Sequence, residues 1–204
     1  DPAIILGFLF ILSAMAFKIS AAPFHMWAPD VYEGAPTPVT AFFSAAPKVA
    51  AIGLLLSLLY GPFAAMIDQW KPVMATLALA SILVGAFGAI GQTNIKRLLA
   101  YSSIGHVGFV LMGIAAGSPR GTEAALTYLA FYVVMSLATF AIVLLMRRNG
   151  RMVEGIADLA GVSRTHPGLA LALAILMFSM AGIPPMVGFF TKFIVLLAAV
   201  EANL

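Results

Sequence analysis

Three lysines lie inside long apolar stretches of this sequence: Lys18, Lys48 and Lys192. An ionised lysine at the centre of a membrane-spanning helix costs about 2.5–3.5 kcal/mol to insert. Such residues usually face a bundle interior or a hydrated cavity, and they mark ion or proton pathways. The alternative is that each lysine lies near a helix end and extends its amine to the membrane surface. We favour the proton pathway.

Prolines accompany all three lysines. A proline inside a helix removes one backbone N–H and frees the carbonyl four residues before it. Pro184 and Pro185 would therefore free the carbonyls of Met180 and Ala181, two turns before Lys192. Inside a membrane, broken backbone is tolerated only where it is buried in protein or lines a wet cavity. The residues at which we predict helix breaks are Pro23, Pro47, Gly182, Pro184 and Pro185.

A histidine, His106, lies near the middle of another apolar stretch. Histidine titrates near neutral pH and can relay protons. A single histidine in a helix bundle can also serve only as a hydrogen-bonding group between helices. Together with the three lysines, His106 could form a line of titratable groups at membrane depth.

A second group of polar residues lies around one predicted turn. His25 and Trp27 are expected at the membrane interface, where they would anchor the helix. For Asp30 and Glu33 we expect a structural role, either as helix caps or in ion pairs with a basic residue of another loop.

Several classes of site find no support. The chain has no cysteine, so a disulfide, a thiolate metal site or a cysteine nucleophile is excluded. Its three histidines are scattered and do not predict a metal site. No glycine-rich loop follows a strand, so no nucleotide site is indicated. The basic residues do not cluster as nucleic-acid binding requires.

The composition indicates which elements position these residues. Of 204 residues, 62% are apolar and only 9% are charged. Soluble domains carry about 25% charged residues. The chain is therefore predicted to be an all-α, polytopic membrane bundle, because the apolar runs lack the alternation of strands. The six predicted spans are residues 2–28, 36–60, 72–91, 95–117, 123–146 and 167–200.

The connecting segments predict the orientation. Six spans place both ends of the chain on one side. Basic residues are more numerous in the loops of the opposite side, which is therefore predicted to be cytoplasmic, with Asp1 and Leu204 outside. The cytoplasmic basic residues are Lys96, Arg97, Arg147, Arg148, Arg151 and Arg164, against Lys71 and Arg120 outside. Residues 147–166 form an amphipathic connection, either as a short surface helix or as a solvated loop.

The first and last spans form a pair, because each is long, is interrupted and carries one lysine. They are predicted to run in opposite directions. Paired interrupted helices of reversed direction suggest an inverted-repeat fold with its functional site near the membrane midplane. The chain begins without Met and has apolar runs at both ends, so we expect it to be an internal piece of a longer protein.

Four segments resemble a known family: Phe17–Pro38, Pro47–Ala50, Asn94–Phe109 and Gly182–Phe193. They are similar to the antiporter-like subunits of bacterial NADH-quinone oxidoreductase, respiratory complex I. The resemblance covers nearly the whole chain. The sister subunit M has glutamate where this chain has Lys192, which favours the subunit N family.

The resemblance implies a fold of about fourteen helices with two inverted repeats, of which this chain would be helices seven to twelve. Lys18 would be the switch residue, which exchanges charge with a glutamate on a helix that this chain does not include. Lys48 and His106 would pass the proton along the membrane axis, and Lys192 would be the exit group. Without that glutamate, the chain alone is not expected to pump protons.

The implied function is proton translocation in a multi-pass subunit of the bacterial inner membrane, as part of a translocase of the electron transport chain. Other membrane-arm subunits and the lipid bilayer would be its partners. No cofactor is expected on this chain, because NADH, FMN, iron–sulfur clusters and quinone would bind other subunits. Two alternatives remain open: a subunit of a multisubunit cation/proton antiporter, and a structural membrane module.

Overall fold

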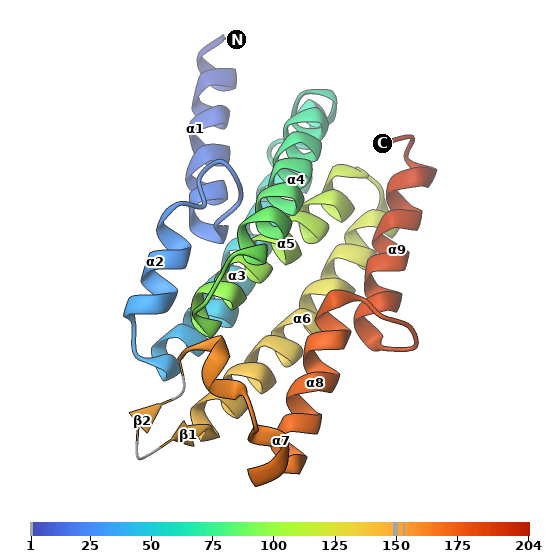
Figure 1. Ribbon diagram of the computed structural model, residues 1–204. Coiled ribbons are helices and arrows are strands. Elements are labelled where there is room, and N and C mark those ends of the chain that lie inside the picture. The colour runs from blue at the N-terminus through green and yellow to red at the C-terminus, as the bar shows by residue number, and fades with distance from the viewer. Residues whose placement is uncertain (1, 149–150, 153) are drawn as a thin grey trace.

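Long helices make up most of the chain (Figure 1). The computed structural model describes residues 2–148, 151–152 and 154–204. Four helices in this part of the chain are long and apolar enough to cross a membrane, and two shorter apolar helices accompany them. The predicted all-α membrane bundle is confirmed.

The first predicted span is broken as expected. Helix α1 (Pro2–Ile19) ends where Ser20 adopts a left-handed backbone with φ 63°, and helix α2 (Trp27–Gly34) begins seven residues later. The Ala21 N–H donates to the carbonyl of Ala16 and closes the helix end. Pro23 lies within the break, as predicted.

The last predicted span is broken as well. Helix α8 (Pro167–Ala181) ends at Gly182, whose φ of 88° favours glycine, and helix α9 (Val187–Glu201) starts after the two prolines. The coloured ribbon shows that α1–α2 and α8–α9 run in opposite directions (Figure 1). The start of α1 and Leu204 lie at the same end of the bundle, as an even number of spans requires.

The predicted break at Pro47 is wrong. Helix α3 (Thr37–Tyr60) continues through this proline without interruption. Both real breaks contain a residue with a left-handed backbone, Ser20 or Gly182, whereas none lies within α3. A proline inside a helix removes one hydrogen bond and kinks the helix, and in α3 the helix continues past the kink because no residue near Pro47 leaves the helical conformation.

Two helices start earlier than predicted. After a short 3-10 turn η1 (Ala64–Met66), helix α4 (Ile67–Ile90) begins five residues before Pro72. Helix α6 (Pro119–Leu145) begins directly after Ser118, whose hydroxyl caps the Gly121 N–H. The predicted starts came too late because charged residues were taken as span boundaries, whereas both helices carry charged residues in their first turns.

Helix α5 (Ile95–Ala115) is the most buried of the long helices. Asn94 caps it, because its side chain accepts the N–H groups of Lys96 and Arg97. Its closest neighbour is α4, and glycine permits the approach, since a Cβ on Gly85 would collide with the backbone of Gly105. α5 also packs against α2, α6 and α9 and so connects both interrupted spans.

The connection after α6 consists of a two-stranded hairpin, β1 (Arg147–Arg148) and β2 (Arg151–Met152), a 3-10 turn η2 (Ile156–Leu159) and the short helix α7 (Val162–Thr165). Of the two alternatives expected for residues 147–166, the single surface helix is not observed, because Met152 lies in β2 and Ile156–Leu159 form a 3-10 turn. Backbone pairing with residues 93–95 competes with helix formation here: the Ile95 N–H donates to the Glu154 carbonyl, at 2.8 Å.

Candidate functional site

Lys48 lies in the centre of the bundle. Its side chain, on α3, is only 2% exposed, and its Nζ donates a hydrogen bond to the Ser103 hydroxyl on α5. The ammonium also lies 5.7 Å from the ring centroid of Tyr32 and 6.0 Å from that of Tyr132. Aromatic faces attract cations, so two rings and a hydroxyl surround this amine.

His106 lies on α5, one turn after Ser103, and is buried as well. Its Nδ1 is 2.6 Å from the Tyr128 hydroxyl on α6. Its ring centroid is 5.0 Å from that of Tyr132, the tyrosine that also faces Lys48. Tyr132 therefore lies between the lysine and the histidine, and α3, α5 and α6 all contribute to this cluster.

Lys192 projects from α9 into the break before it. Its Nζ donates to the carbonyls of Met180 and Ala181, both at 2.9 Å. These are the two carbonyls that the prolines were predicted to free, so the predicted neighbourhood of this lysine is confirmed. The ammonium also lies 5.1 Å from the ring centroid of Phe109 on α5.

His106 and Lys192 share a cavity of about 410 Å³ between α4, α5, α8 and α9. Its walls are mainly apolar, and Ser102 and Phe109 also belong to the lining. The structure thus brings three of the four predicted residues into one line, from Lys48 past Tyr132 to His106 and then across the cavity to Lys192.

Lys18 is not part of this line. It lies in the last turn of α1 with its side chain exposed, and within the described residues it makes no hydrogen bond or ion pair. The break next to it is held by other groups: the Trp27 indole donates to the Phe17 carbonyl at 2.9 Å, and the Ala22 N–H to the Ser81 hydroxyl. Trp27 thus anchors the helix within the chain.

The predicted ion pairs of Asp30 and Glu33 are confirmed. Arg97 at the start of α5 donates to both carboxylates, at 2.6 and 2.9 Å. Next to it, the buried Lys96 pairs with Glu154 of the connecting segment at 2.8 Å. These ion pairs fix the start of α5 to α2 and to the connection between α6 and α8.

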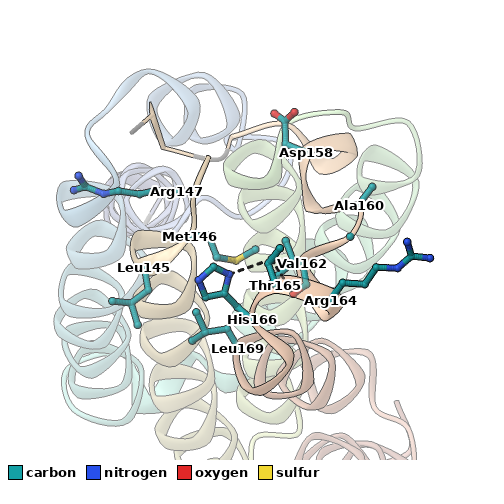
Figure 2. Close-up of a pocket in the computed structure, with 11 residues that line it drawn as sticks. Leu145, Met146, Arg147, Asp158, Ala160, Val162, Arg164, Thr165, His166 and Leu169 are labelled. Carbon is teal, nitrogen blue, oxygen red and sulfur yellow. Dashed lines mark hydrogen bonds between the residues drawn. The ribbon is translucent and has the colours of Figure 1, made fainter. Parts of the chain in front are cut away.

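A second cavity, of about 540 Å³, lies in the connecting segment around His166 (Figure 2). Its charged side chains do not converge, since Arg147 and Arg164 extend to opposite sides and Asp158 extends away from the centre. Within the part of the chain that the structure describes, the His166 ring hydrogen-bonds to its neighbour Thr165, at 3.1 Å between Nδ1 and Oγ1. This cavity therefore lacks the polar convergence of the buried line.

Sequence reasoning missed the polar partners of the buried line. These are Tyr32, Ser103, Tyr128 and Tyr132. A signal for two of them was present, because Tyr128, Tyr132 and Ser136 recur at intervals of four residues and so share one face of α6. A helix in a membrane that presents three hydroxyls on one face turns that face towards protein.

Comparison with known proteins gives the family. Residues 1–204 match the family described as "NADH:quinone oxidoreductase/Mrp antiporter, TM". The chain belongs to this family. NADH-quinone oxidoreductase subunit N of Paramagnetospirillum magneticum is 60% identical over 204 residues, which are all of this chain and 42% of that protein. The chain thus spans less than half the length of this relative.

Two solved structures of the NADH:quinone oxidoreductase/Mrp antiporter type share the fold. A chain of the Mrp complex from Dietzia sp. matches with a TM-score of 0.91 and 28% identity, over all of this chain and 38% of its own length. A chain of respiratory complex I from Thermus thermophilus has a TM-score of 0.75 and 36% identity, over 93% of this chain and 41% of its own. The resemblance stated from the sequence is confirmed.

Proposed function

We propose that this chain is the part of a subunit N of NADH-quinone oxidoreductase that moves protons along the membrane-arm axis. The observation that carries the proposal is the buried line itself. Lys48, Tyr132, His106 and Lys192 follow one another through contacts of 6.0 Å and 5.0 Å and a shared cavity. Lysine and histidine can both take up and release protons, and intramembrane groups of this kind mark proton relays.

In the proposed sequence of steps, Lys18 is the switch, and it exchanges charge with a carboxylate that other parts of the full-length protein supply. Its exposed side chain supports this role, because a lysine that has no partner among the described residues is available to one from another part of the protein. Lys48 and His106 then pass the proton along the axis. Lys192 is the exit-side group, adjacent to the broken backbone of α8 and α9.

The subunit is proposed to work in the bacterial inner membrane, next to other membrane-arm subunits. Electron transfer to quinone would occur on those other subunits, and no cofactor is assigned to this chain. The end of the bundle that carries Arg97 and the connecting segment is proposed to face the cytoplasm, which places Leu204 outside. The predicted position of Asp1 lies outside the described residues.

A cation/proton antiporter subunit is the second candidate, and the high TM-score to the Mrp complex favours it. The identity of 60% to a subunit N favours the first. A sodium-driven pH gradient across vesicles, formed without NADH by the full-length protein, would support the antiporter. A purely structural role would be indicated if neutral substitutions of the lysines loosened assembly and left pumping intact.

The proposal is tested with Lys48→Met in the full-length subunit, assembled in the complete complex. Methionine fills a similar volume but cannot carry a proton. NADH-driven proton uptake into membrane vesicles should fall by about tenfold or more, since a general acid–base group contributes a factor of about 10²–10⁴. The matched control is Ser103→Ala, which removes the hydroxyl partner of Lys48 and keeps the amine.

The two variants separate the proton-transfer role from a structural one. Proton transfer predicts a large loss with Lys48→Met and a small one with Ser103→Ala, while the complex stays assembled. A structural role predicts similar losses in both, because each variant removes the same hydrogen bond. Wild-type pumping in Lys48→Met would contradict the proposal.

A further inference from the structure

A large groove lies at the end of the bundle opposite to the connecting segment. Its volume is about 870 Å³, which exceeds that of the cavity beside His106. The end of α3, the turn η1, the start of α4 and the start of α6 form its walls. Its lining includes Leu56, Tyr60, Ile67, Gly117, Glu123 and Leu126.

Two unpaired charges of opposite sign lie at this groove. Glu123 lines it, and within the described residues its carboxylate has no ion-pair partner. Lys71 is outside the lining itself but lies against Gly117 of the lining, since a Cβ on Gly117 would be 2.9 Å from the Lys71 Cδ. Among the described residues, the Lys71 amine has no ion-pair partner. A ligand that carries both a positive and a negative group would satisfy both side chains.

The rest of the groove is mainly apolar, with two threonines, Thr122 and Thr127, in its lining. Leu56 precedes Tyr60 by one turn in α3, and Leu126 lies further along α6 than Glu123 and is 46% exposed. Tyr60 lies at the end of α3, where tyrosine side chains commonly mark the level of lipid headgroups. The groove therefore has a charged end at the helix turns and an apolar length that could hold an acyl chain.

We propose that this groove binds a phospholipid whose headgroup carries a primary ammonium. The ammonium donates to the carboxylate of Glu123, and the phosphate accepts from Lys71. The acyl chain lies along Leu56 and Leu126. A trimethylammonium headgroup has no N–H to donate, so Glu123 distinguishes the two lipid classes, because charge-assisted hydrogen bonds are the stronger ones.

The test uses the complete complex with the full-length subunit, reconstituted in vesicles with photoreactive lipids. One probe is a phosphatidylethanolamine and the other a phosphatidylcholine, each with the reactive group on an acyl chain. The ethanolamine lipid should label the peptides that contain Leu56 and Leu126 about tenfold more strongly, the factor that one charge-assisted hydrogen bond supplies. Labelled peptides are identified by mass spectrometry.

Three variants complete the experiment. Glu123→Gln should abolish the preference between the two lipids, and Lys71→Gln should weaken labelling by both. The matched control is Asp68→Asn, an exposed acidic residue of α4 outside the groove lining, which should change nothing. Equal labelling by the two lipids in the wild type would overturn the proposal. Absence of labelling by both would also overturn it and would indicate that a protein segment covers the groove.

Discussion

The two interrupted spans carry one lysine each, yet the two lysines have different surroundings. In the α8–α9 span, Lys192 donates to the two carbonyls of the break and shares a cavity with His106. In the α1–α2 span, Lys18 is exposed, and within the described residues its amine makes no hydrogen bond to the break next to it. Trp27 and Ser81 hold the polar groups of that break instead.

Side-chain direction in helices explains the difference. The Cα–Cβ bonds of an α-helix tilt towards its N-terminus. Lys192 follows its break, so its side chain extends back into the break. Lys18 precedes its break, so its side chain extends away from it. A lysine that follows a break can thus donate hydrogen bonds to the freed carbonyls, whereas a lysine that precedes a break remains available to a partner.

The largest effects are expected from two single variants of the full-length subunit, Lys18→Met and Lys192→Met. Each variant should lower NADH-driven proton uptake by about tenfold or more. Only Lys192→Met should also lower the midpoint of thermal unfolding, because an unsatisfied buried backbone group costs about 1–3 kcal/mol. Equal midpoints in the two variants would show that the two lysines do not differ as described.

A smaller effect is expected from two buried serines, Ser179 in the last turn of α8 and Ser20 in the α1–α2 break. Ser179 accepts the Gly188 N–H at 3.2 Å, whereas the Ser20 hydroxyl has no hydrogen-bond partner among the described residues. Ser179→Ala should therefore destabilise the full-length subunit by about 1–3 kcal/mol, and Ser20→Ala should be nearly neutral. Denaturation of the two variants side by side checks this, and the reverse order would contradict the comparison.

The smallest effect is expected at Trp27. Trp27→Phe keeps an aromatic ring in the break but removes the indole N–H that donates to the Phe17 carbonyl. The loss should be about 0.5–1.5 kcal/mol, the net value of a typical hydrogen bond. The midpoint of thermal unfolding measures it. An unchanged midpoint would mean that the α1–α2 break does not depend on this bond.

The break between α8 and α9 was predictable because two local signals coincided. Pro184 and Pro185 follow Gly182, a residue suited to the left-handed conformation that ends a helix. Pro47 lacks such a neighbour, and α3 continues through it. The connecting segment was not predictable from periodicity. Its strands β1 and β2 pair with each other, and residues 154–156 pair with residues 93–95, which are distant in the sequence.

The titratable residues of the candidate site were identifiable from the sequence, but the tyrosine that lies between two of them was not. Lys48, His106 and Lys192 were identifiable because charges and histidines are rare inside apolar stretches. Tyr132, which lies between Lys48 and His106, is an ordinary residue in a membrane helix. Its role depends on the packing of α6 against α3 and α5, which the sequence does not specify locally.

The most direct test of the buried line is proton uptake in the complex with His106→Gln. Glutamine can still hydrogen-bond to Tyr128 but cannot take up a proton, so the packing role is retained and the relay role is lost. His166→Gln, a substitution of an exposed histidine in the connecting segment, is the matched control. NADH-driven proton uptake should fall strongly in the assembled His106→Gln complex and stay near wild type in the control. Wild-type uptake with His106→Gln would contradict proton transfer along this line.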